Sequence, residues 1–235
     1  LANEVRIATN EIKQNLRENN SKFFEAYLIL SLDSLMKKNF ENSRNYLNKS
    51  YKYIENNRIA LIIYESLKEY LDTFQYKKIS NKKKKFGNLS FINEVFQRCY
   101  LQDENIDNYF KQLINSENDM DYSRYTFFYI HHLVQNNKLI DAKQIANNIS
   151  IVGNSLLVSQ AKSWIKNDKL DEFSKIFSCQ SSSDIVSEFF YLVANLYTSQ
   201  DDYKNSSFYL NISQYLKPKF IFNLTLLAEN YYANN

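Results

Sequence analysis

Residues 190–218 read FYLVANLYTSQDDYKNSSFYLNISQYLKP, and two amphipathic helices joined by a short polar turn explain this order of residues best. Apolar or small residues recur at three- and four-residue spacing, which places them on one face of each helix. They are Phe190, Val193, Ala194 and Tyr197 before the turn, and Ser206, Leu210 and Ser213 after it. Small residues at Ala194 and Ser206 would let the two backbones approach closely. The stretch therefore predicts an antiparallel helical hairpin.

The same pattern recurs upstream about every 33 residues. A polar turn is followed by a bulky apolar residue, and three residues later by a residue that faces a neighbouring helix. The instances are Phe40 with Ser43, Ile106 with Tyr109, Leu139 with Ala142, Leu170 with Phe173, and Tyr203 with Ser206. One such hairpin cannot bury its own apolar face, so repeated hairpins must stack. The sequence predicts an all-α protein, a right-handed α-solenoid of about six antiparallel hairpins with roughly 12 or 13 helices.

Apolar periodicity also places the individual helices along the chain. They are expected over residues 2–18, 22–37, 40–55, 58–76, 89–101, 105–116, 122–136, 139–149, 154–167, 170–178, 185–200, 203–216 and 219–232. Asn and Asp fill most of the intervening turns, because they tolerate left-handed backbone geometry better than other residues except glycine. Only two glycines, Gly87 and Gly153, and one proline, Pro218, occur.

The repeat resembles the tetratricopeptide repeat, whose pattern is Trp-x2-Leu-Gly-x2-Tyr, then Ala-x3-Phe, then Pro. The matching residues are Phe190, Val193, Ala194, Tyr197, Ser206, Leu210 and Pro218. The resemblance covers residues 22–235 and is strongest after Ser187. Tyr109, and Tyr64 with Tyr76, stand where the family prefers small residues. It implies one array over residues 1–235, with a leading helix over 1–21, repeats over 22–218, and the first helix of a further repeat over 219–235. The array is expected to be a fragment of a longer chain.

Composition excludes several classes of site. Gly87 and Gly153 are too far apart to form a glycine-rich phosphate-binding loop. The net charge of +3 comes from one cluster of lysines, without which the chain would be net negative. The cluster consists of Lys77, Lys78, Lys82, Lys83, Lys84 and Lys85. A nucleic-acid groove needs positive charge spread along one face, so no nucleic-acid partner is expected. The cluster is either a solvated loop or a peripheral contact with an anionic lipid or acidic partner. No apolar run is long enough for a transmembrane segment.

Histidine and cysteine offer little chemistry at this stage. His131 and His132 are adjacent on an expected helix, where their side chains diverge and cannot share a metal ion as an i, i+4 pair could. Neither a metal site nor a cofactor is therefore expected. Cys99 and Cys179 are read as buried free thiols in preference to a disulfide, since a large helical core needs no covalent link. The carboxylates lie in polar turns, and the chain is not expected to be an enzyme.

The resemblance implies a ligand groove lined by the first helix of each hairpin. Its residues would be Glu94, Arg98, Phe127, His131, Val158, Lys162, Tyr191, Asn195, Thr225 and Glu229. The expected function is a non-catalytic protein–protein interaction scaffold that binds a peptide or protein segment. Phe127 and Tyr191 would be its aromatic anchors, and replacing both with alanine would weaken binding while leaving helicity intact.

Other functions stay open at this stage. The chain could be a small-ligand or signal-peptide receptor, the targeting arm of a larger enzyme, or a structural component of an envelope. Residues 208–220 also resemble uncharacterised bacterial proteins of this class, which are often exported, so periplasmic and cytoplasmic locations are both compatible with the sequence.

Overall fold

The computed structural model describes residues 2–17, 22–79, 86–115, 123–148, 156–221 and 223–233. Within these residues it contains thirteen α-helices, one short 3-10 helix and no strand, which confirms the all-α prediction. The chain divides into two compact units, Leu1–Phe86 and Gly87–Asn235. A single array over the whole chain stays a prediction. No helix in the described part of the chain is long and apolar enough to cross a membrane.

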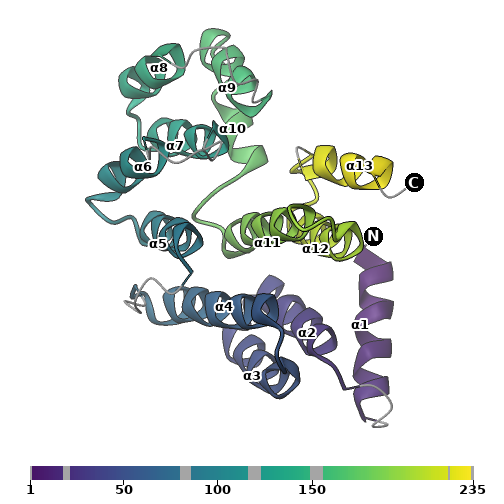
Figure 1. Ribbon diagram of the computed structural model, residues 1–235. Helices are drawn as coiled ribbons and strands as arrows, with labels where there is room; N and C mark the ends of the chain where they lie inside the picture. Colours follow the sequence, from purple (N-terminus) through teal and green to yellow (C-terminus); the bar gives the residue numbers. More distant parts are fainter. Residues whose placement is uncertain are drawn as a thin grey trace. The chain divides into compact units, whose positions relative to one another are not determined.

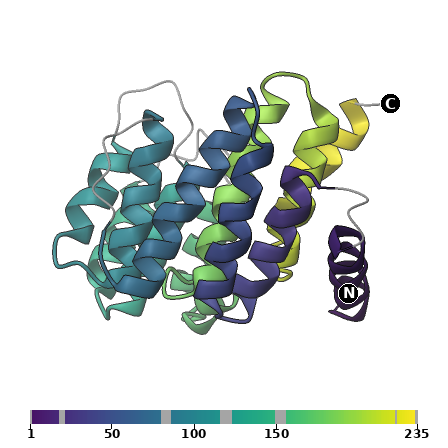
Figure 2. The ribbon, with the colours of Figure 1, turned by 90° about the horizontal axis from the view of Figure 1, so that it is seen from below.

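The first unit is built around a pair of adjacent helices, α2 and α3. Its elements are α1 (Ala2–Arg17), α2 (Phe24–Met36), α3 (Phe40–Ser50), the 3-10 helix η1 (Tyr51–Tyr53) and α4 (Arg58–Tyr76). Helix α3 packs against both α2 and α4, and the three run alongside one another in Figure 2. Asn39 and Asn57 cap α3 and α4, because each side chain accepts a hydrogen bond from a backbone N–H of the first turn.

The second unit holds the remaining nine described helices (Figure 1). They are α5 (Asn88–Leu101), α6 (Ile106–Ile114), α7 (Ser123–Gln135), α8 (Leu139–Asn148), α9 (Leu156–Lys166), α10 (Asp171–Ile176), α11 (Ser182–Thr198), α12 (Tyr203–Leu216) and α13 (Asn223–Ala233). Most boundaries lie within two residues of those expected from the sequence. The main exceptions are α3, which ends five residues earlier, α11, which begins three residues earlier, and α13, which begins four residues later.

Five helix ends are closed in the same way, by a residue other than glycine with left-handed backbone geometry. These residues are Lys38, Gln102, Asn137, Asp168 and Asp201, with φ between 53° and 59°. In each case the next backbone N–H donates to a carbonyl five residues back, as in Asn39 to Ser34 (2.9 Å) and Asp202 to Tyr197 (3.0 Å). This is the hydrogen bond of a Schellman motif, which satisfies carbonyls at the helix end. These left-handed residues recur with the spacing of the sequence repeat, so the turns between the helices follow the repeat.

Lys38 is the least suited of these residues to its backbone, since left-handed geometry brings Cβ against the carbonyl oxygen. We expect Lys38→Gly to raise the free energy of unfolding by about 1 kcal/mol, because glycine has no Cβ to clash. Urea unfolding followed by circular dichroism measures the change. The matched control is Lys37→Gly. Residue 37 has a φ of −82°, which suits any residue, so glycine gains nothing there and the variant protein should be less stable than the wild type. Destabilisation of both variants would contradict the prediction.

Small side chains let the paired helices approach, as the sequence predicts. In α2 and α3, the Ser31 hydroxyl donates to the Ser43 carbonyl at 2.8 Å. In α11 and α12, Ala194 and Ser206 are fully buried, and Ser187 and Ser213 each donate to the other's carbonyl at 2.8 Å. Serine fits these close crossings because its hydroxyl is satisfied by the opposite backbone.

The order of packing in the second unit differs from a stack in which each helix contacts only its neighbours in sequence. Figure 1 shows an extended segment that leads from α10 back to α11, and α11 packs against α5. Aromatic rings fill the space that this return creates. Phe128 of α7 lies 4.3 Å from Phe177, 5.6 Å from Phe96 of α5 and 6.1 Å from Phe220, measured between ring centroids. Helices far apart in sequence thus share one aromatic core.

Candidate functional site

Two of the expected groove residues, Glu94 and Arg98 on α5, form an ion pair with each other. Arg98 donates to Glu94 at 2.8 and 2.9 Å and to Asp103 at 2.6 Å. Its guanidinium also lies 4.0 Å from the centre of the Tyr109 ring. Burial alone would lower the pKa of Arg98, but the hydrogen bonds that it donates to the two carboxylates outweigh this effect and raise the pKa. The two carboxylates and the Tyr109 ring hold the Arg98 guanidinium in place at the C-terminal end of α5.

Phe127, His131 and Val158 lie in the core and not on a groove, which corrects the expectation for them. Their exposed fractions are 0%, 1% and 5%. The Phe127 ring packs against Phe173 at 5.7 Å, and the His131 ring stacks on the same side chain at 5.8 Å. The expectation failed for the two residues of α7 because Phe173 of α10 covers them. Lys162 is the one member of the set on α7 or α9 that is partly exposed.

His131 is a neutral core residue. Burial, with smaller effects from His132 and Lys217, lowers its pKa to about 3. Its Nε2 atom is buried without a hydrogen-bond partner among the described residues. A neutral imidazole packed against the rings of Phe173 and Phe177 is a structural residue and not the groove residue expected from the sequence.

Tyr191 lies beneath Arg124, a residue that sequence reasoning missed. The Arg124 guanidinium is 3.8 Å from the centre of the Tyr191 ring. It makes a bidentate pair with Glu188, at 2.6 and 2.7 Å, and donates to the Asn223 side chain at 2.7 Å. The Glu188 side chain is fully buried and that of Arg124 is 12% exposed. Burial alone would lower the pKa of Arg124, but the charge of Glu188 raises it. Helices α7, α11 and α13 meet at this guanidinium.

Three expected groove residues remain accessible on α11 and α13. Asn195 is partly exposed, whereas Thr225 and Glu229 are exposed. The two helices are neighbours, because Thr198 of α11 donates to the Asn230 side chain of α13 at 3.2 Å. The structure therefore leaves three of the expected residues accessible on two helices that touch, and it places the residues of α7 in the core.

The lysine cluster is described only in part. Lys77 ends α4 with left-handed geometry, and Lys78 lies 5.7 Å from the centre of the Tyr76 ring. Lys82, Lys83, Lys84 and Lys85 lie outside the described residues. The lipid or acidic contact stays a prediction.

Cys99 and Cys179 form a disulfide, so the preferred expectation of two free thiols was wrong. The bond joins α5 to the extended segment before α11, and both residues are buried. The Gln180 side chain continues this junction by donating to the Cys99 carbonyl at 3.1 Å. The two cysteines are 80 residues apart in sequence, and only the return of the chain to α5 brings them together.

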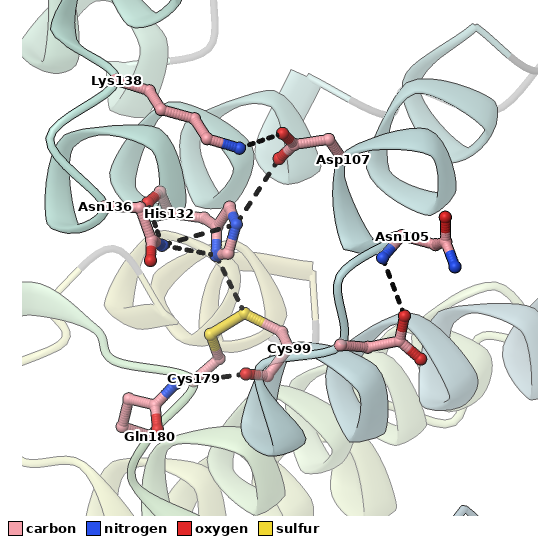
Figure 3. A network of polar contacts seen from close by, with 9 residues as sticks. Cys99, Asn105, Asp107, His132, Asn136, Lys138, Cys179 and Gln180 are labelled. Carbon is pink, nitrogen blue, oxygen red and sulfur yellow. Dashed lines mark hydrogen bonds and ion pairs between the residues drawn. A yellow bond between two sulfur atoms is a disulfide. The ribbon is translucent and has the colours of Figure 1, made fainter.

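Two ionisable side chains lie beside the disulfide (Figure 3). The Cys99 sulfur is 3.5 Å from Nδ1 of His132, and Nε2 of His132 is 3.5 Å from Oδ1 of Asp107. The Asn136 amide lies 3.3 Å from the same Nδ1 and donates to the His132 carbonyl. Burial is the main cause that lowers the pKa of His132, with Asp107 acting against it.

Asp107 is held from the other side by Lys138, which donates to Oδ2. Its Oδ1 atom is buried and makes no hydrogen bond within the described part of the chain. Lys138 lies in the polar turn between α7 and α8. No sequence signal joined that turn to Cys99, because the residues lie on three separate segments.

Comparison of the chain with protein-family models, with curated proteins and with solved structures found no match.

Proposed function

We propose that the chain is a non-catalytic protein-interaction scaffold that binds a peptide segment across the accessible residues of α11 and α13. One observation carries the proposal: these two helices are in contact through Thr198 and Asn230, and they leave accessible the residues Asn195, Thr225 and Glu229. Tyr191, which is partly exposed, lies on the same helix as Asn195, one turn before it. The surface offers an aromatic ring, an amide, a hydroxyl and a carboxylate, which suit a peptide's mixture of apolar and polar groups.

The same surface is held in place from beneath. Arg124 ties α11 to the start of α13 through Glu188 and Asn223. Near the other end of α13, Asn230 donates to Ser206 at 2.7 Å and accepts from Thr198. Two polar anchors fix the spacing between the helices. A rigid surface binds with a smaller loss of conformational entropy than a mobile one, which favours recognition of an extended or helical segment.

A peptide selected from a random display library on the wild-type protein tests the proposal. We expect Thr225→Arg/Glu229→Lys to weaken the affinity for that peptide at least about tenfold, since it changes the charge and shape of the binding surface. Isothermal titration calorimetry measures the affinity. The matched control is Asp141→Lys/Gln144→Arg, which makes the same charge change at exposed positions of α8. Equal affinities for all three proteins, or failure to enrich any peptide, would overturn the proposal.

A further inference from the structure

The disulfide and its neighbours contain three potential metal ligands. The sulfurs of Cys99 and Cys179 and a ring nitrogen of His132 all lie within 4.8 Å of one another. They come from α5, from the segment before α11, and from α7, and all three residues are buried. The aromatic core and the return of the chain fix these three segments independently of the disulfide, because Phe128 of α7 contacts both Phe96 and Phe177.

The spacing of these donors fits a tetrahedral zinc ion. Zinc bonds of about 2.3 Å to sulfur and about 2.0 to 2.1 Å to nitrogen place neighbouring ligand atoms roughly 3.4 to 3.8 Å apart. The Cys99 sulfur and Nδ1 of His132 are 3.5 Å apart, within this range. The Cα atoms of the two cysteines are 5.8 Å apart, so rotation of the side chains can separate the sulfurs once their bond is broken.

The surroundings of His132 are those of a metal ligand. A ligating histidine usually donates its second ring N–H to a carboxylate, which fixes the tautomer and the orientation of the ring. With Nδ1 directed at the sulfurs, the proton belongs on Nε2, which lies 3.5 Å from Oδ1 of Asp107. Among the residues that the structure describes, that oxygen is buried without a hydrogen bond, and Lys138 holds the other oxygen of the same carboxylate. Asp107 is a positioning residue in this arrangement.

We propose that the reduced protein binds one Zn²⁺ through the thiolates of Cys99 and Cys179 and Nδ1 of His132. A dithiol reductant breaks the sulfur–sulfur bond, supplying two electrons and two protons, and is itself oxidised to a disulfide. Zinc then displaces the two thiol protons, and water completes the four ligands. Neutral disulfide sulfur is a poor ligand, because zinc binds thiolate. The oxidised and zinc-bound states therefore exclude each other, and the cluster binds metal only when it is reduced.

The test compares oxidised and reduced wild-type protein, titrated with Zn²⁺ and, as a spectroscopic probe, with Co²⁺. The chain has only two cysteines, so a thiolate-to-cobalt charge-transfer band reports this cluster alone. We expect one metal ion per reduced chain, no band from the oxidised chain, and no band from Cys99→Ser/Cys179→Ser. Helicity is followed by circular dichroism in parallel. Zinc binding by folded, reduced wild-type protein that is no tighter than that of the double serine variant would overturn the proposal.

Histidine variants test whether His132 is a zinc ligand or whether the two thiolates bind the metal ion without it. We expect His132→Gln to weaken zinc binding about 10- to 100-fold, and Asp107→Asn to weaken it about tenfold. The matched control is His131→Gln, which alters the adjacent histidine, whose ring packs against Phe173 instead of the sulfurs, and should leave the affinity unchanged. Equal affinities for the His132→Gln and His131→Gln proteins would remove His132 from the site and contradict the proposal.

Discussion

An Arg124→Met protein is expected to lose about 3 to 5 kcal/mol of unfolding free energy, because Glu188 would be left as an uncompensated buried charge. The Glu188 side chain is 0% exposed, and both of its oxygens accept hydrogen bonds from Arg124. Methionine replaces the length of the arginine side chain but none of its five donors. The Asn223 side chain would also lose its contact with α7. Urea unfolding followed by circular dichroism measures the loss.

The double variant Arg124→Met/Glu188→Met is the control for this prediction. It removes both charges, so it should lose less stability than the single variant, although it has one more substitution. A single variant that loses less than about 1 kcal/mol would show that Glu188 is not desolvated as described. A double variant less stable than the single one would contradict the prediction. It would show that removing Glu188 lowers the free energy of unfolding further, even though no unpaired charge is left.

Phe127→Ala is expected to destabilise the protein by about 3 to 5 kcal/mol, as large-to-small replacements of a buried phenylalanine do. The ring is fully buried and lies 5.7 Å from both Phe128 and Phe173, and 6.3 Å from Trp164. This reverses the expectation from sequence that Phe127 is a ligand anchor whose loss leaves the fold intact. Thermal and urea unfolding both report the effect.

An exposed apolar residue of the neighbouring helix α8 provides the matched control for Phe127. Ile140 is 83% exposed, so Ile140→Ala should change the free energy of unfolding by no more than about 0.5 kcal/mol. If Phe127→Ala unfolds with wild-type stability but loses peptide affinity, the original assignment to a groove is restored and the description of the core is wrong.

The helices and their turns were predictable because the signals for them are local. Asn137, Asp168 and Asp201 adopt the left-handed geometry expected of Asn and Asp at hairpin turns, and α12 begins at Tyr203 as expected. The early start of α11 was also readable, since Ser181 and Asp184 form a capping pair in which the Ser181 side chain accepts from the Asp184 N–H. Local rules of this kind need no knowledge of the tertiary fold.

The start of α13 was misplaced because tertiary packing prevails there. A helix was expected from residue 219, just after Pro218, yet Phe220 is fully buried against Phe128, and α13 begins only at Asn223. Pro218 lies in the turn between α12 and α13, and this turn places the Phe220 ring in the core. A single-sequence pattern cannot distinguish a proline that opens a helix from one that shapes the turn before it.

The candidate site was only partly predictable, and α7 shows why. Residues 125–133 are all buried, so this helix is enclosed on every side and has no groove face. Its nearly continuous run of aromatic and aliphatic residues was a usable signal, since a helix that is apolar all round belongs to a core. The pairing of Cys99 with Cys179 left no such signal. It depends on the return of the chain from α10 to α5, which involves residues 80 positions apart.

The covalent bond between Cys99 and Cys179 makes residues 100–178 a closed ring, attached to the rest of the protein at both ends. A protease that cuts the chain once anywhere inside this ring leaves the fragments joined. Nicked and intact protein would therefore have the same mass under non-reducing conditions, apart from the water added by hydrolysis, and would separate into two pieces only after reduction.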